Sequence, residues 1–169
     1  MALTRRIAPV FALAIACLTT ISASAQIYTQ GELEITSAWS RATPMVAPVA
    51  GGYVTITNRG KTPDTFLGGS SPVASKVEIH RSTIQNGVAS MRPLSAGVTI
   101  NPGETVEFAP GGTHLMFIQP TKIFKDGEKV EATLLFERAG EIKVEFAIQP
   151  LGARGPAQNE NHQDHGTSP

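Results

Sequence analysis

The 169-residue chain is long enough for one domain with a sizeable hydrophobic core, and its 14 basic and 14 acidic residues give a formal net charge of zero. There is no basic excess to hold nucleic acid or an anionic membrane surface, so we expect no nucleic-acid partner. The chain has one cysteine, Cys17, which excludes an internal disulfide and a site built on several thiolates.

The start of the chain is typical of a secretory signal peptide. Arg5 and Arg6 form a basic pair, residues 7–21 are mostly apolar, and an A-x-A cleavage site ends at Ala25. Cleavage there would leave twelve basic and fourteen acidic residues, a net charge of −2, and no cysteine. The alternatives are an uncleaved anchor and a weak lipoprotein box ending at Cys17. We expect export to the periplasm and no membrane span in the mature chain.

The remaining sequence is typical of short strands separated by turns. Apolar and polar residues alternate within segments 32–39, 51–60, 75–80, 97–112, 129–140 and 141–150. Asn101-Pro102-Gly103 divides one segment into two strands, and Ala139-Gly140 joins the last two segments as a hairpin. No segment has sustained helical periodicity. The pattern predicts an all-β sandwich or small barrel.

Three regions follow from this reading. We predict a signal peptide over 1–25 and a single β-domain over 26–150. The tail over 151–169 lacks apolar periodicity, and we expect it to be disordered.

Histidine and methionine are scarce, yet they gather in two segments. His80 and Met91 flank Asn86-Gly87, a strong turn signal that can fold the chain back and bring the thioether towards the imidazole. His80 follows Val77 and Ile79 at the end of its expected strand, on the opposite face from both.

The second segment places His114 two residues before Met116. In a strand these side chains leave the same face, and Leu115 and Phe117 take the other, which we expect to be the core.

Two imidazoles and two thioethers would suit a soft metal ion. Thioether sulfur is uncharged and selects Cu(I), whereas zinc prefers thiolate or carboxylate ligands and calcium prefers a cluster of oxygens. The alternative is that these methionines fill the core and the histidines are ordinary surface or hydrogen-bonded residues. Spacing alone leaves both interpretations open.

The motif has a close parallel in one family. The chain contains His80, ten residues, Met91, twenty-two residues, and then His114-x-Met116. The surrounding segments are "AWSRATP", "GGYVTITN", "SSPVASKVEIH", "NGVASMRP" and "PGGTHLMF". In these features the chain resembles the periplasmic Cu(A) chaperone family, PCu(A)C, over about residues 33–149.

The resemblance implies a cupredoxin-like Greek-key β-sandwich or barrel that binds one Cu(I) through His80, Met91, His114 and Met116. It implies delivery to the Cu(A) centre of cytochrome c oxidase, with oxidase subunit II and Sco-type copper proteins as partners. We expect a monomeric carrier and not an enzyme, because a blue-copper redox centre needs a cysteine ligand and no catalytic triad or carboxylate pair stands out. The alternatives are periplasmic copper scavenging or tolerance, and a metal-free secreted interaction module.

The tail carries His162 and His165. We expect at most weak Cu(II) binding there, since imidazole suits Cu(II) but two ligands hold a metal poorly. The alternative is a solubilising tail.

Other residues have more ordinary expected roles. We expect Trp39 to be a core anchor and Met45 to be a hydrophobic plug in a proline-rich loop, with an approach to the site as the alternative. Arg92 is expected to steer a partner or to stabilise an acidic neighbour, and the alternative is a plain surface charge. Gly111 and Gly112 are expected to shape the turn that presents the second histidine.

Overall fold

The computed structural model describes residues 26–85 and 87–156, and this part contains eleven strands and no helix. The predicted signal peptide over 1–25 and the tail residues His162 and His165 lie outside the described residues. The strands are β1 (Tyr28–Gln30), β2 (Leu33–Arg41), β3 (Val49–Asn58), β4 (Asp64–Ser71), β5 (Ala74–Gln85), β6 (Val88–Pro93), β7 (Val98–Ile100), β8 (Thr105–Phe108), β9 (Thr113–Ile118), β10 (Lys129–Phe136) and β11 (Gly140–Gln149).

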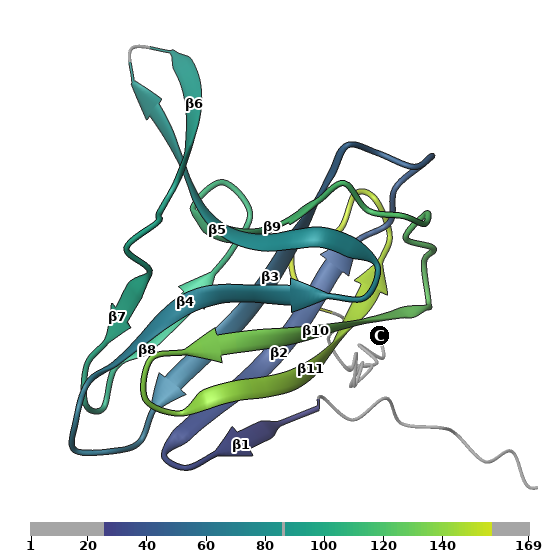
Figure 1. Cartoon of the computed structure of the whole chain (residues 1–169). Helices are drawn as coiled ribbons and strands as arrows, with labels where there is room; N and C mark the ends of the chain where they lie inside the picture. The colour runs from purple at the N-terminus through teal and green to yellow at the C-terminus, as the bar shows by residue number, and fades with distance from the viewer. Residues whose placement is uncertain (1–25, 86, 157–169) are drawn as a thin grey trace, which may run out of the picture.

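Seven of these strands close into a barrel. Their order is β2-β11-β10-β4-β5-β9-β3, and the pairing of β3 with β2 completes the ring. All pairings in the ring are antiparallel except that of β11 with β2. The other strands, β1, β6, β7 and β8, extend the barrel at its edges, as Figure 1 shows. The expected all-β, cupredoxin-like fold is confirmed.

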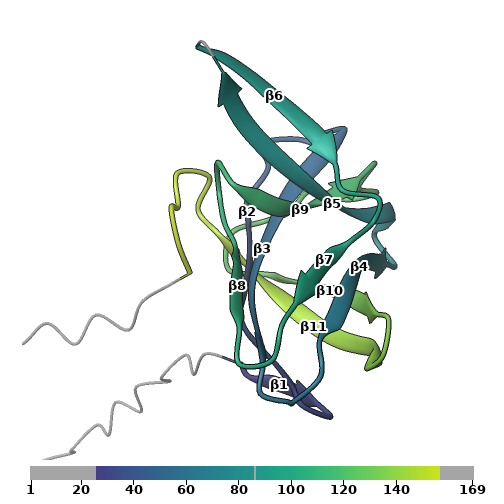
Figure 2. The same ribbon diagram turned by 90° about the vertical axis from the view of Figure 1, so that its left-hand side faces the viewer.

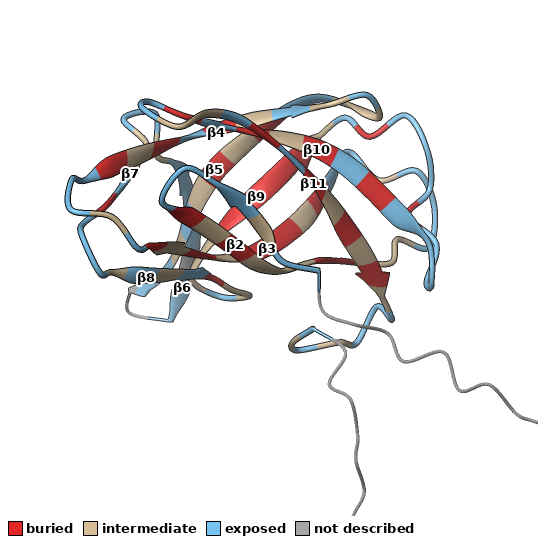
Figure 3. Cartoon of the chain, turned by 90° about the horizontal axis from the view of Figure 1, so that it is seen from below, coloured by how far each residue is buried: buried red, intermediate tan, exposed pale blue. Residues whose placement is uncertain are grey.

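The core follows from the period-two alternation of the strands. Buried and exposed residues alternate along β10 and β11, so one face of each strand lines the interior (Figure 3). Phe117 packs edge-on against Phe124 and Phe146, at centroid distances of 5.5 Å. Fully burying such a side chain contributes roughly 1.5–3 kcal/mol. As predicted, Leu115 and Phe117 belong to the core.

One barrel strand, β4, escaped the sequence analysis because two glycines interrupt its pattern. Gly68 has a φ of 111°, and a Cβ on it would lie 2.9 Å from the carbonyl oxygen of Val77. A Cβ on Gly69 would collide with the backbone of Thr133. The glycines allow β4 to lie close to β5 and β10, so here they serve strand packing and not a turn.

The turns expected at Ala139-Gly140 and at Asn101-Pro102-Gly103 join their strands in different ways. The hairpin across Gly140 is confirmed, with Phe136 opposite this glycine. The segment around Pro102 does contain two strands, β7 and β8. They pair with β4 and β3 respectively and not with each other.

The β5–β6 hairpin projects beyond the barrel (Figure 1; Figure 2). Its β5 strand was expected to end at His80, but it continues to Gln85 because the added residues pair with β6. Gly87, with a φ of 78°, lies in the turn. The hairpin therefore carries residues of the first His/Met segment away from the barrel wall.

The C-terminal end of the described chain lies against the barrel. Residues 151–156 form turns and bends, and Arg41 Nε donates a hydrogen bond of 2.7 Å to the carbonyl of Ala153. Within the described residues, no helix is long and apolar enough to cross a membrane.

Candidate metal centre

The two histidines of the sequence motif lie side by side on the barrel wall. Strand β5 pairs with β9 so that His80 is directly opposite His114, and their ring centroids are 6.3 Å apart. Directly opposed residues share one face of a sheet, and this face is opposite to the one formed by Val77 and Ile79. This separation is short enough for one metal ion to be shared by the two rings, with a bond of about 2 Å to a nitrogen of each.

The two methionines occupy the same face in different surroundings. Met116 is opposite Glu78 on β5 and Gly51 on β3, and it is only 7% exposed. Met91 is opposite Ser82 on the hairpin, two residue pairs beyond His80 along β5, and it is 49% exposed. The fold thus brings the four predicted ligands to one side of the β6-β5-β9 sheet, with one thioether buried and one accessible.

A tight turn orients His114. Gly111 has a φ of 81°, as its predicted role requires, and the amide of Gly112 donates to the carbonyl of Ala109. The carbonyl of Gly112 in turn accepts a hydrogen bond from His114 Nδ1 at 3.0 Å. A backbone carbonyl can only accept, so the proton is on Nδ1 and the lone pair of Nε2 is left for a ligand.

A carboxylate contacts the other imidazole. Glu78 Oε2 lies 3.0 Å from His80 Nε2, and Lys76 Nζ lies 3.2 Å from Glu78 Oε1. Hydrogen bonds from His80 and Lys76 hold the pKa of the Glu78 carboxyl below its ordinary value. The sequence analysis gave Glu78 no role, although two-residue spacing in a strand could have indicated this contact.

Aromatic side chains form one wall beside the second histidine. The Tyr53 ring lies 6.5 Å from that of His114 and 4.4 Å from that of Trp39, and Arg41 Cζ lies 5.7 Å from the Tyr53 centroid. Burial raises the pKa of the Tyr53 phenol, and the positive charge of Arg41 opposes the rise only in part. The phenol is therefore neutral near pH 7 and is not a phenolate ligand.

A β-bulge explains why Trp39 belongs to this wall. Between Thr36 and Trp39 the register of β2 against β3 shifts by one residue, and Ser37 has a φ of 53°. The shift turns Trp39 to the face of Tyr53. The tryptophan is buried as expected, but it packs outside the interior cluster and next to the candidate site.

The structure bears on the predictions made for Met45 and Arg92. Met45 is 66% exposed, so its expected role as a hydrophobic plug is wrong: the proline-rich loop lies at the surface and offers it no apolar pocket. Arg92 is exposed and makes no ion pair with any described residue. It therefore forms no ion pair with an acidic neighbour in the described part of the chain, and partner steering and a plain surface charge remain as its two predictions.

The donor set limits which metals could bind. Among the described residues, no group of three or more His, Cys, Asp or Glu side chains is arranged to hold a metal ion. A metal held by His80 and His114 would therefore need the thioethers to complete its coordination, which favours a soft ion.

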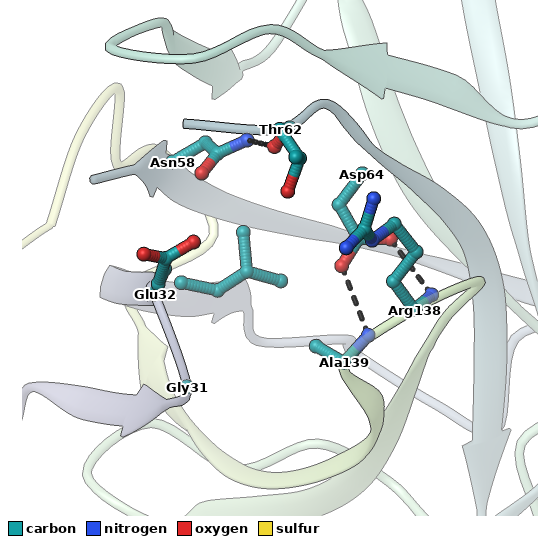
Figure 4. A pocket seen from close by; sticks show the side chains of 8 residues that line it. Gly31, Glu32, Asn58, Thr62, Asp64, Arg138 and Ala139 are labelled. Atoms are coloured by element: carbon teal, nitrogen blue, oxygen red, sulfur yellow. Dashed lines mark hydrogen bonds between the residues drawn. The ribbon is translucent and has the colours of Figure 1, made fainter. Parts of the chain in front are cut away.

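A pocket at the far end of β3 has a structural explanation. It is lined by residues that include Asn58, Asp64 and Arg138 (Figure 4). Asp64 accepts backbone hydrogen bonds from Thr65, Arg138 and Ala139, which ties β4 to the β10–β11 turn. Asn58 Nδ2 donates to the carbonyl of Thr62. These polar groups are occupied by the fold itself.

Comparisons with known proteins show which family the chain belongs to. The family model described as "Putative lipoprotein LpqE-like" matches residues 33–148. The chain belongs to this PCuAC-related family. The predicted resemblance to the Cu(A) chaperones is thereby confirmed. A relative, the putative lipoprotein Lxx21020 of Leifsonia xyli subsp. xyli (strain CTCB07), is 28% identical over 151 residues, covering 87% of this chain and 86% of that protein.

Solved PCuAC domains have the same fold as this LpqE-like protein. The copper-bound PCuAC domain from PmoF2 is 26% identical with a TM-score of 0.64, covering 74% of this chain and 98% of that domain. The apo form of the PmoF2 domain is 27% identical with a TM-score of 0.65, covering 78% and 100%. CuI-DR1885 from Deinococcus radiodurans is similar in fold, with 24% identity, a TM-score of 0.54, and coverage of 76% and 83%.

Proposed function

We propose that this protein is a copper carrier that binds one Cu(I) ion through His80, Met91, His114 and Met116. The observation that supports the proposal most directly is the juxtaposition of the two imidazoles, 6.3 Å apart, on a face that also carries both methionines. A similar domain of PmoF2 has been solved with copper bound. The described residues include no cysteine, so the soft donors available on this face are thioethers.

The residues differ in how they would release the ion. His114 is held by the Gly112 carbonyl and Met116 is buried, so both are fixed parts of the site. Met91 is half exposed on the projecting hairpin, and its thioether is the ligand that an acceptor could replace first. Uncharged ligands let the thiolates of an acceptor displace them one at a time. The protein would thus transfer its cargo by ligand exchange, without catalysing a reaction.

We propose the Cu(A) centre of cytochrome c oxidase as the destination, with oxidase subunit II and Sco-type proteins as partners. The support is the His/Met spacing shared with the Cu(A) chaperone family. Deleting the gene should lower oxidase activity, and added copper should restore it. Unchanged oxidase activity with increased copper sensitivity would contradict delivery and support copper tolerance.

We propose that the protein works outside the cytoplasm. The putative lipoprotein from Leifsonia and the LpqE-like family description both point to export. Mass spectrometry of the protein purified from its membrane and periplasmic fractions tests the form of export. A mature N-terminus at Gln26 is expected, whereas a lipid-modified Cys17 would contradict cleavage after Ala25.

The binding site itself is tested by titrating the mature protein with Cu(I) against a competing chelator. One tight equivalent is expected, and it should raise the melting temperature by mass action. A Met91→Ala, Met116→Ala double variant should lose tight binding, and Met45→Ala, which alters the exposed third methionine, should not. Unchanged binding in the double variant would contradict the assignment, and a wild type without binding would support a metal-free module.

A further inference from the structure

A carboxylate and an imidazole two residues apart on β5 form an ordered contact beside the candidate site. Glu78 Oε2 lies 3.0 Å from His80 Nε2, and Lys76 lies 3.2 Å from the other carboxylate oxygen. The His80 side chain is 14% exposed and that of Glu78 is 35% exposed. The glutamate thus lies at the edge of the site, with an exposed ammonium group on one side and the His80 ring on the other.

This contact determines which nitrogen of His80 carries the proton. An ionised carboxylate can only accept hydrogen bonds, so Nε2 must donate, and in the neutral ring the lone pair is on Nδ1. Nδ1 is the one buried side-chain nitrogen or oxygen without a hydrogen-bond partner in the described part of the chain. A buried acceptor with no partner costs free energy, so its presence beside a second imidazole points to an external ligand.

The second histidine has the opposite arrangement. His114 donates from Nδ1 to the Gly112 carbonyl, which leaves Nε2 as the nitrogen with the lone pair. The two rings face each other across β5 and β9 but present different nitrogens. The His114 ring is fixed by a backbone carbonyl and the His80 ring by a side chain. Only the His80 ring can therefore be released by a substitution.

We propose that Glu78 is a positioning residue, which fixes His80 as the Nε2–H tautomer so that Nδ1 binds the cargo ion while His114 binds through Nε2. This inference deepens the copper-carrier proposal and rests on it. Outer partners of this kind set both the ring orientation and the basicity of a metal-binding imidazole. A pair of unlike nitrogens lets two directly opposed rings approach one ion from β5 and β9.

The first test measures the tautomers without metal. Long-range proton–nitrogen NMR of the apo protein, at a pH where both rings are neutral, should show His80 protonated on Nε2 and His114 on Nδ1. Glu78→Ala should convert His80 to a mixture of tautomers and leave His114 unchanged. A wild-type His80 protonated on Nδ1, or a tautomer that is insensitive to Glu78→Ala, would overturn the inference.

The second test adds Cu(I), which is diamagnetic and suited to the same spectra. On binding, the nitrogen shifts should move most at His80 Nδ1 and His114 Nε2. Glu78→Ala should weaken Cu(I) binding by about 10- to 100-fold. Glu78→Gln, whose amide oxygen can still accept from Nε2, should recover most of that loss. The two variants should show the same native fold by circular dichroism.

Two matched variants separate this role from a general charge effect. Lys76→Ala removes the other partner of Glu78, and Glu145→Gln removes a carboxylate that pairs with Lys129 elsewhere on the barrel. Both should keep Cu(I) affinity within about threefold of wild type, well inside the change expected for loss of an outer partner. If both weaken binding as much as Glu78→Ala, or if Glu78→Ala binds like wild type, the inference fails. A wild type that binds no Cu(I) refutes the copper-carrier proposal instead.

Discussion

Met91 lies directly opposite Ser82 on the β5–β6 hairpin, two residue pairs beyond His80. The β5–β6 hairpin projects beyond the barrel (Figure 1), and the Ser82–Met91 pair belongs to it. Met116 lies on the barrel wall and is buried. The two methionines therefore share a face of the sheet but contribute very differently to the stability of the fold.

This difference predicts that two single variants both weaken Cu(I) binding but differ in their effect on the stability of the fold. Met116→Ala should lower the unfolding free energy of the apo protein by about 2–5 kcal/mol, as expected for a buried methionine, and should also weaken Cu(I) binding. Met91→Ala should change stability by less than about 0.5 kcal/mol and still weaken binding. Urea unfolding and a chelator-competition titration measure the two quantities.

Ile84→Ala is the control for general disturbance of the hairpin. Ile84 is 76% exposed and lies on the same face of the ribbon as Met91. Its replacement should leave Cu(I) affinity unchanged. If Ile84→Ala weakens binding as much as Met91→Ala, the hairpin and not the thioether accounts for the effect.

Sequence analysis predicted the fold class well because apolar and polar residues alternate along β-strands that have one buried face. The same rule assigned Leu115 and Phe117 to the core and His114 and Met116 to the other face. The hairpin that carries Met91 was also predictable, because Asn86-Gly87 is a local signal.

Features that depend on pairing between distant strands were not predictable. The direct opposition of His80 and His114 requires β5 to pair with β9 in one register, which no local pattern specifies. The face on which Trp39 lies depends on a one-residue bulge, and strand β4 was hidden by Gly68 and Gly69. The contact of Glu78 with His80 is local and was partly predictable, because two-residue spacing places both side chains on one face of β5.

A pair of like charges on the hairpin leads to a second prediction. Arg81 and Arg92 are directly opposed, and such pairs destabilise a ribbon. Arg92→Glu should therefore raise the unfolding free energy by about 0.2–1 kcal/mol, and the gain should shrink at high salt. Arg92→Gln removes the repulsion without adding an attraction, so its stability should fall between that of wild type and that of Arg92→Glu. An Arg92→Glu protein less stable than Arg92→Gln would contradict this account.

The contact between Gly51 and Tyr53 leads to a third prediction. A Cβ at residue 51 would lie 2.8 Å from the Tyr53 hydroxyl oxygen and 3.2 Å from its Cζ. Gly51→Ala should displace the ring towards His114 or Trp39 and cost about 1–3 kcal/mol, as overpacking does. It should also weaken Cu(I) binding, since the displaced ring borders the site.

The Gly51→Ala, Tyr53→Phe double variant distinguishes this contact from a general intolerance at residue 51. Removing the hydroxyl relieves the shorter of the two contacts, so the double variant should be more stable than Gly51→Ala alone. Tyr53→Phe by itself supplies the reference for a double-mutant cycle. Purely additive effects would show that the alanine does not press on the phenol.

The final prediction concerns the pH dependence of stability that comes from Glu145, which contacts Lys129 and Gln26. Glu145 Oε2 lies 2.7 Å from Lys129 Nζ and also accepts a hydrogen bond from Gln26. The hydrogen bond from Lys129 lowers the pKa of Glu145, and the same bond raises the pKa of Lys129. A depressed carboxyl pKa stabilises the fold above the unfolded-state pKa, and this contribution disappears as the pH falls through the folded-state value.

Wild type should therefore melt at a higher temperature than Glu145→Gln at pH 7, and the difference should vanish well below pH 4. It should also decline at strongly alkaline pH, as Lys129 loses its proton. Both groups are at the surface, so the effect should be small and should weaken with salt. Glu141→Gln is the control, since Glu141 is exposed on the same strand and outside the ion pairs of the described residues. A melting difference that persists at pH 3 would show that Glu145 stabilises the strand by packing and not through its charge.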